Sequence, residues 1–180
     1  MRLDQFNNSW YHPGNLLKRT LWYFMNLMFI KNQWNPFNGL KRGILKLFGA
    51  KVGKGVIIKP SVNIKYPWKL EIGNHVWIGE GVWIDNLGMV KIDSHVCISQ
   101  GALLLTGNHN YKKTTFDLMI GDIIIEEGVW IGARAIVGPG VHCKAFSILT
   151  IGSVAVDNLE LNSIYQGNPA KKIRERTIEA

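Results

Sequence analysis

Histidine and cysteine side chains offer the most versatile chemistry in this chain, because they can accept protons, attack electrophiles or ligate metals. Cys97 and Cys143 show neither a CxxC motif nor the Cys/His spacing of a zinc site. His75 and His95 lie twenty residues apart and could chelate a stray metal ion. Two ligands are fewer than a functional site uses, so we expect no metal cofactor. The two cysteines also favour a reducing compartment over a disulfide-built fold.

Basic side chains are concentrated in the first third of the chain. The 180 residues carry a net charge of +8, and 47% of them are apolar. Residues 1–69 contain 12 Lys or Arg and 1 Asp, a net +11, whereas residues 70–180 contain 9 basic and 12 acidic residues, a net −3. Such asymmetry is typical either of an anionic partner for the first third, such as a membrane surface, a nucleic acid or an acidic glycan, or of a basic face that only increases solubility.

A six-residue repeat begins at Val52 and continues over most of the remaining chain. Aliphatic or compact residues recur every six positions in blocks of three, and a small residue follows most of them four positions later. The blocks start 18 to 20 residues apart, except for one interval of 33, which we interpret as an insertion covering residues 110–124. The repeating positions are Val52, Ile58, Ile64, Ile72, Ile78, Ile84, Ile92, Ile98, Leu104, Ile125, Ile131, Val137, Cys143, Leu149 and Ala155.

A period of six excludes an α-helix, in which apolar positions recur at three and four. It is also too long for simple alternation within one strand. It suits a short strand followed by a sharp turn, with the aliphatic side chain pointing inward. Three such edges close a triangular coil, and stacked coils bury their faces against one another. We therefore predict an all-β parallel solenoid of about five coils over residues 51–160.

Residues 1–50 are predicted to form a helical cap or docking segment, with helices over 16–30 and 39–48. Residues 161–180 are predicted to form a turn and a charged tail or short helix. No signal peptide is visible, and the most apolar stretch, residues 21–30, is too short to span a bilayer. We expect a cytoplasmic protein that can contact the inner membrane face peripherally.

The repeat resembles that of the hexapeptide-repeat acyltransferases, which fold as left-handed parallel β-helices. The segments 47–68, 72–88, 96–111, 128–141 and 165–173 are similar to those of acetyltransferases of colanic acid and related exopolysaccharide biosynthesis. The resemblance runs nearly end to end, and is more distant to maltose, galactoside and streptogramin acetyltransferases. It implies a left-handed coil, a homotrimer and acetyl-CoA as co-substrate.

The resemblance also implies roles for individual residues. A family histidine that acts as general base matches His109, in Thr106-Gly107-Asn108-His109-Asn110-Tyr111. A neutral imidazole can accept the proton of a sugar hydroxyl as that hydroxyl attacks a thioester. Asn86 matches a polar residue that binds acceptor hydroxyls, and Asp85 and Tyr111 are further candidates on the acceptor side.

On the cofactor side, the resemblance places acetyl-CoA in a groove between neighbouring subunits. Trp130 matches the residue that flanks the pantetheine arm, and the backbones of Ala133 and Ile151 match groups that contact it. The amide of Ala133 would also stabilise the oxyanion of the tetrahedral intermediate. Lys171 and Arg174 match basic residues that meet the nucleotide phosphates. Val156 replaces a threonine near the adenine.

These features predict an acetyl-CoA-dependent O-acetyltransferase that acts on a sugar or glycan in bacterial surface-polysaccharide biosynthesis. An O-acetyltransferase for xenobiotics or other small molecules, built on the same fold, is the alternative within the class. A non-catalytic scaffold whose basic first third binds anions is the alternative from another class. Zinc enzymes that share the solenoid are disfavoured because no HxxxxH pair occurs, and nucleic acid is not the expected partner, since the aromatic residues of the first third must pack.

Overall fold

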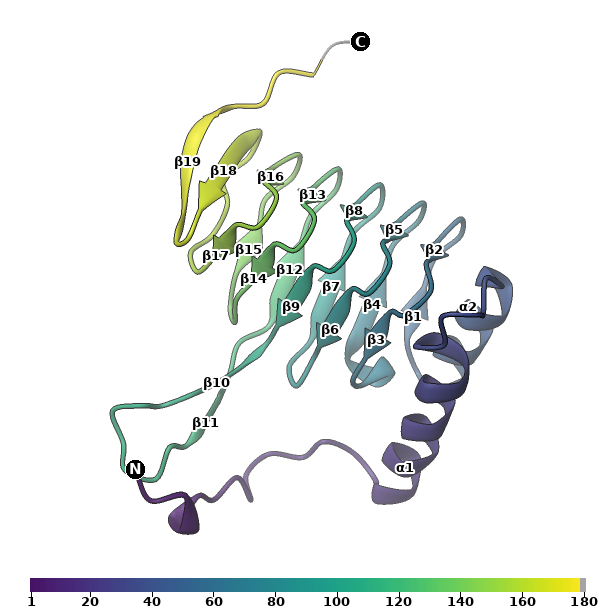
Figure 1. The fold of residues 1–180 in the computed structure, drawn as a ribbon, viewed down its shortest axis with the longest axis vertical. Helices are drawn as coiled ribbons and strands as arrows, with labels where there is room; N and C mark the ends of the chain where they lie inside the picture. The colour runs from purple at the N-terminus through teal and green to yellow at the C-terminus, as the bar shows by residue number, and fades with distance from the viewer. Residues whose placement is uncertain (179–180) are drawn as a thin grey trace.

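The repeat folds into three parallel sheets that stack as a triangular prism, shown in a computed structural model that describes residues 1–178 (Figure 1). The first sheet contains β1 (Lys51–Val52), β4 (Leu70–Ile72), β7 (Val90–Ile92), β12 (Ile123–Ile125) and β15 (His142–Cys143). The second contains β2 (Ile57–Ile58), β5 (Trp77–Ile78), β8 (Cys97–Ile98), β13 (Trp130–Ile131), β16 (Ile148–Leu149), β18 (Ser163–Gly167) and β19 (Ala170–Glu175). The third contains β3 (Asn63–Ile64), β6 (Trp83–Asp85), β9 (Leu103–Leu105), β14 (Ile136–Val137) and β17 (Val154–Ala155).

Equivalent repeat positions lie directly above one another in the core. In the second sheet, Ile58, Ile78, Ile98, Ile131 and Leu149 form one column in register, and each is at most 1% exposed. Each buried side chain of this kind contributes about 1.5–3 kcal/mol relative to an exposed one. The predicted β-solenoid is confirmed: five coils are complete on all three sheets, and a sixth begins where Leu159 bridges to Cys143.

One corner of each coil requires a left-handed backbone. His75 and His95 adopt φ of 55° and 60° there, and their rings stack with centroids 5.3 Å apart. Gly55 holds the same corner one coil earlier, with φ of 67°, and an added Cβ would lie 2.5 Å from Nδ1 of His75. Glycine is therefore required where the ring of the next coil covers the backbone. Residues 1–178 contain no group of three or more His, Cys, Asp or Glu arranged to hold a metal ion.

The helices that precede the coils are α1 (Leu16–Met25), continued by a π-helical turn over Asn26–Ile30, and α2 (Asn38–Leu47). Asn15 caps α1 by accepting a hydrogen bond from the amide of Leu17. Trp22, Ile30 and Leu45 point into the core. The two predicted helices are thus confirmed. None of the helices in residues 1–178 has the length and hydropathy needed to cross a bilayer.

Side chains of these helices donate hydrogen bonds to backbone carbonyls at the open edge of the first coil. The amine of Lys41, which is fully buried, donates to the carbonyls of Ile58 and Lys59 at 3.0 Å. The indole of Trp22 donates to the carbonyl of Ile64 at 2.9 Å. An unpaired sheet edge invites association with other strands, so this covering protects the solenoid.

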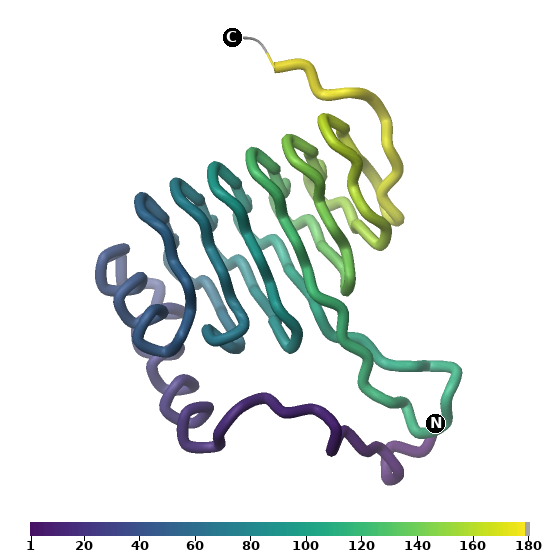
Figure 2. The backbone as a smooth tube through the Cα atoms, turned by 180° about the vertical axis from the view of Figure 1, so that it is seen from behind, coloured from purple at the N-terminus to yellow at the C-terminus, as the bar shows by residue number. Residues whose placement is uncertain are grey.

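The insertion leaves the prism as a two-stranded hairpin of β10 (Gly107–His109) and β11 (Leu118–Ile120). Residues 1–14 form a strap that contains one short 3-10 helix (Leu3–Gln5), crosses the open side of the molecule and ends at the hairpin (Figures 1 and 2). There the amide of Arg2 donates to the carbonyl of Thr114 at 2.7 Å. The two irregular segments of the chain therefore meet far from the helices.

The C-terminal segment differs from the prediction of a charged tail or helix. Strand β19 pairs antiparallel with β18, and a turn at Gly167 and Ala170 joins the two strands. The charged side chains of β19 are exposed, while its backbone covers the edge of the last coil. The sequence of β19 does not alternate between apolar and polar residues. It forms a strand because its backbone pairs with the edge strand β18. The last two residues of the predicted tail, 179 and 180, lie outside the described residues.

Candidate active site

His109 ends β10, at the corner where the chain would pass from the third sheet to the first. Its backbone is fixed by antiparallel pairing with Leu118 across the hairpin. The imidazole lies parallel to the ring of Phe116, with centroids 4.3 Å apart and planes 3° apart. Phe116 itself has a left-handed backbone, with φ of 53°, an uncommon conformation for an aromatic residue that is often found at functional sites.

The carbonyl oxygen of Phe116 lies 2.9 Å from Nδ1 of His109. A carbonyl can only accept a hydrogen bond, so in the neutral imidazole Nδ1 carries the proton and Nε2 keeps its lone pair. Nε2 has no hydrogen-bond partner among residues 1–178. The hairpin therefore orients His109 so that its basic nitrogen is available to accept a proton.

The half-buried His109 ring borders a cavity of about 530 Å³ between the hairpin, the strap and the first coils. The strap supplies Phe6, whose ring lies 5.7 Å from the imidazole, and Tyr11. Residues Asn8, Ser9, Pro13, Arg19, Lys65, Tyr66, Leu87 and Leu118 complete the wall. The volume falls within the range of small-molecule sites, and the aromatic rings provide apolar surface.

Hydrogen bonds tie the strap to the prism beside this cavity. The hydroxyl of Tyr11 donates to the carbonyl of Leu87 at 2.9 Å, and the amine of Lys69 donates to the same carbonyl at 2.6 Å. Burial raises the pKa of the Tyr11 phenol well above its usual value, so the phenol stays protonated and can donate. Burial lowers the pKa of Lys69.

The three residues predicted on the acceptor side lie in different environments. Asp85 is nearly buried and forms an ion pair of 2.8 Å with Lys65, a residue of the cavity wall. Tyr111 is 77% exposed on the far part of the hairpin loop. The prediction for Asn86 is wrong: its side chain is fully buried, and its amide bonds the backbone of Tyr66 and Lys69. Its side chain provides hydrogen bonds to the backbone at the corner where two extra residues interrupt the repeat.

The residues predicted to bind the cofactor lie on another side of the prism. Trp130 is exposed on the outer face of the second sheet, where its indole donates to Oγ of Ser99 at 2.9 Å. Ala133 and Ile151 occupy the same turn on successive coils, and the amide of Gly152 donates to the carbonyl of Ala133 at 2.9 Å. No acceptor within residues 1–178 takes the amide hydrogens of Ala133 and Ile151, so both can donate to a ligand.

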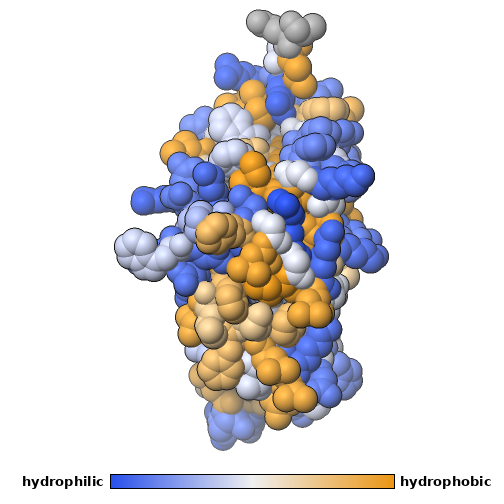
Figure 3. Space-filling view, turned by 90° about the vertical axis from the view of Figure 1, so that its right-hand side faces the viewer, coloured by the Kyte–Doolittle hydropathy of each residue, from blue (hydrophilic) through white to orange (hydrophobic). Residues whose placement is uncertain are grey.

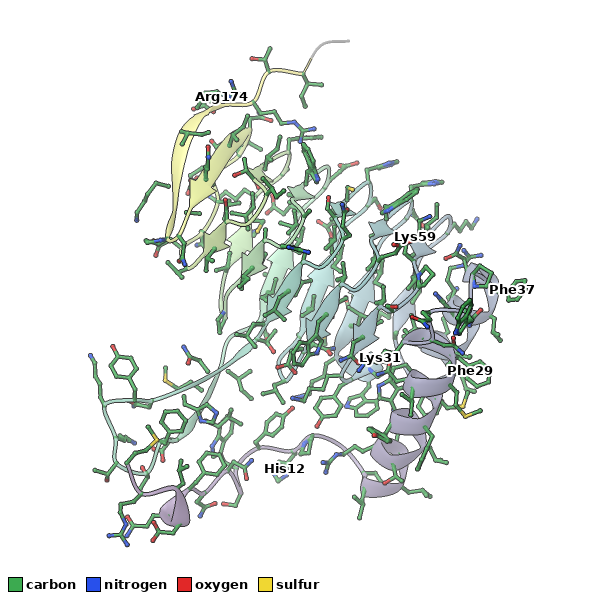
Figure 4. All side chains as sticks on the ribbon, in the orientation of Figure 1. His12, Phe29, Lys31, Phe37, Lys59 and Arg174 are labelled. Carbon is green, nitrogen blue, oxygen red and sulfur yellow. The ribbon has the colours of Figure 1, made fainter. Side chains whose placement is uncertain are left out.

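Lys171 and Arg174 extend this surface across the last coil. Arg174 pairs with Ile164, which lies in register with Ile148 and Trp130 along the second sheet. Its side chain lies at the end of the molecule opposite the strap that holds His12 (Figure 4). Lys171 is exposed and its amine lies 3.7 Å from the carboxylate of Asp157. Val156 is exposed and borders a smaller cavity beside the hairpin.

The structure therefore forms two separate groups within one chain. His109, Asp85 and the cavity lie at the corner between the third and first sheets, whereas Trp130, Ala133 and Arg174 follow the second sheet. Sequence reasoning missed the carbonyl of Phe116, the strap and Arg19. The strap bond joins residues 76 positions apart, and no local signal in residues 1–14 indicates it.

The triangular prism of parallel coils is a fold that this chain shares with solved hexapeptide-repeat acetyltransferases. No family model matches the chain. It is, however, 36% identical over 168 residues to the putative colanic acid biosynthesis acetyltransferase WcaF of Escherichia coli strain K12, an alignment that covers 92% of this chain and 91% of that protein. The chain therefore belongs to the hexapeptide-repeat acetyltransferase family, and it is an acetyltransferase.

One further relative agrees with this assignment, and a solved structure shares the fold. The galactoside O-acetyltransferase of Escherichia coli strain K12 is 28% identical over 83% of this chain and 75% of its own length. A hexapeptide-repeat acetyltransferase of Vibrio cholerae, VCA0836, solved with acetyl coenzyme A, superposes with a TM-score of 0.80, 19% identity and coverage of 90% of this chain and 88% of its own. The fold match confirms the left-handed β-helix.

Proposed function

We propose that this acetyltransferase transfers the acetyl group of acetyl-CoA to a sugar hydroxyl during exopolysaccharide biosynthesis, with His109 as the general base. The observation that supports the proposal most is the unpartnered Nε2 of His109 at the wall of a cavity large enough for a sugar. The printed names of two relatives, a colanic acid biosynthesis acetyltransferase and a galactoside O-acetyltransferase, support the choice of acceptor. Complexes of structural neighbours with acetyl-CoA and CoA support the choice of donor.

The proposed reaction follows from these positions. The hydroxyl oxygen forms a bond to the thioester carbonyl carbon while its proton moves to Nε2 of His109. The negative charge on the former carbonyl oxygen is stabilised by the amide of Ala133. When the carbon–sulfur bond breaks, the departing thiolate takes the proton from the imidazolium. General base catalysis of this kind contributes about 10²–10⁴ in rate.

A homotrimer would join the two groups of residues. His109 and the groups of Trp130 and Ala133 lie at different corners of one prism, so the hairpin of one subunit must approach the cofactor surface of the next. In this arrangement Trp130 flanks the pantetheine arm, the Ile151 backbone contacts it, and Lys171 and Arg174 meet the nucleotide phosphates. Asp85 and Tyr111 remain proposed acceptor contacts.

Contact with an anionic membrane is the second part of the proposal. The outward side of α1 and the following turn is almost entirely apolar, and these side chains gather on the lower half of the face in Figure 3. A contiguous exposed apolar surface of this kind is typical of a protein or membrane contact. The exposed apolar residues there are Leu16, Leu17, Leu21, Tyr23, Phe24, Leu27 and Met28.

Charge near this surface favours an anionic bilayer as its occupant. Lys31 and Lys46 are exposed at the ends of the two helical segments, and residues 1–69 carry a net +11. Each basic residue near an anionic membrane contributes about 1 kcal/mol, and exposed apolar side chains insert at the interface. Phe37, which directly precedes α2 (Figure 4), and Leu40 within α2 are further exposed apolar residues.

Sedimentation with lipid vesicles tests this contact. Vesicles that contain phosphatidylglycerol should retain the protein, and the double variant Leu21→Glu/Phe24→Glu should be released. Vesicles of phosphatidylcholine alone should retain little. Equal binding to both vesicle types would contradict the proposal, as would a loss of trimer mass in the double variant, because the surface would then be a contact between copies.

An acceptor panel tests the catalytic proposal. Release of free thiol from acetyl-CoA should require a sugar, and the product should carry an O-acetyl group detectable by mass spectrometry. Transfer to an amino group, or equal release without acceptor, would contradict it.

A further inference from the structure

Arg19 places an unmatched charge at the wall of the His109 cavity. It lies in the first turn of α1, is half-buried, and lines both this cavity and the one between α1 and the third sheet. Within residues 1–178, its guanidinium forms no ion pair. A guanidinium is always charged, so Arg19 presents to the cavity a cation that no carboxylate of the described residues pairs with.

The other cations nearby are already engaged. Lys65 pairs with Asp85, and Lys69 donates to the carbonyl of Leu87. No carboxylate is among the residues that line the cavity, and the nearby carboxylate of Asp85 is paired with Lys65. Burial raises the pKa of the Tyr11 phenol, Arg19 opposes that shift, and Asp85 adds to it. Arg19 is therefore the cation of the cavity wall that no carboxylate of the described residues pairs with.

We propose that the His109 cavity binds an acceptor that carries a phosphate group, with Arg19 as the ligand of the phosphate. The fork of a guanidinium matches two phosphate oxygens, and a phosphate carries more negative charge than a carboxylate. This inference rests on the proposed transfer to a sugar and names the class of that sugar. The phosphate belongs either to a soluble sugar phosphate or to a lipid-linked sugar.

The test offers the sugar that proves active in the acceptor panel in four forms: the neutral sugar, its 1-phosphate, its nucleotide diphosphate, and its prenyl diphosphate in detergent. The enzymes are the wild type, Arg19→Gln and Lys54→Gln, which removes an equal charge from an exposed position between β1 and β2. Arg19→Gln should raise the KM for phosphorylated forms by about 10- to 100-fold, the contribution of a hydrogen bond to a charged group.

The same substitution should leave kcat, the KM for acetyl-CoA, the KM for the neutral sugar and the melting temperature unchanged. The preferred form then identifies the source of the phosphate. Equal KM values for neutral and phosphorylated forms in the wild type would overturn the inference, as would an unchanged KM in Arg19→Gln or a preference for a uronic acid.

Binding of inorganic pyrophosphate, measured by calorimetry, separates this inference from the proposed function. Wild type and Lys54→Gln should bind it, and Arg19→Gln should bind about 10- to 100-fold more weakly. Such a result would support the phosphate site even if no sugar accepted acetyl. Equal binding by all three proteins would overturn the site while leaving the role of His109 intact.

Discussion

The coils and the irregular segments of this molecule are stabilised in different ways. In the coils, every inward side chain lies between equivalent side chains of its neighbours, as Leu104 does between Ile84 and Val137. The strap and hairpin depend instead on a few hydrogen bonds and partly exposed aromatic rings, including the bond of Tyr11 to Leu87. The coils therefore supply rigidity, whereas the candidate base stands in the part with fewer stabilising contacts.

The largest stability effect is expected from a cavity in the coils. Leu104→Ala should lower the free energy of unfolding by about 2–5 kcal/mol, because Leu104 is fully buried and its neighbours cannot collapse into the space. Chemical denaturation measures the change, and turnover per folded molecule should stay close to the wild type. A loss of turnover at unchanged stability would show that the coils take a direct part in the chemistry.

A smaller effect is expected where the helices cover the first coil. Lys41→Met should lower the free energy of unfolding by about 1–3 kcal/mol, because the carbonyls of Ile58 and Lys59 lose their buried donor. Lys46→Met, on the exposed side of the same helix, is the matched control and should change stability by at most about 0.5 kcal/mol. Equal effects of the two substitutions would mean that the amine of Lys41 does not hold the edge.

The smallest stability effect is expected in the strap. Tyr11→Phe removes the hydroxyl that donates to Leu87 and should cost about 0.5–1.5 kcal/mol. Hydrogen exchange of residues 1–14 should accelerate and the acceptor KM should rise, while the coils keep their protection. Tyr23→Phe, at an exposed tyrosine of α1, serves as control. Uniform acceleration across the coils would show that strap and prism unfold as one unit.

The six-residue period predicted the prism because each inward-pointing residue marks one short strand, and each strand forms one edge of a coil. Residues one repeat unit apart, such as Ala133 and Ile151 or His75 and His95, occupy equivalent turns of successive coils in the structure. The predictions for Asn86, made from the family resemblance, and for the C-terminal tail failed because backbone hydrogen bonding decided the outcome: Asn86 turns inward to bond a corner, and β19 forms because β18 offers an edge. The bond that fixes the tautomer of His109 depends on the fold of the hairpin, which the repeat does not specify.

The role of His109 can be tested most directly by single-turnover acetyl transfer with His109→Gln, a variant that keeps a polar side chain of similar size. His12→Gln, at an exposed histidine of the strap, is the control. The account predicts that His109→Gln lowers the rate by about 10²–10⁴, with the melting temperature and the affinity for acetyl-CoA unchanged, and that His12→Gln keeps the wild-type rate. Transfer at the wild-type rate by folded His109→Gln would contradict it.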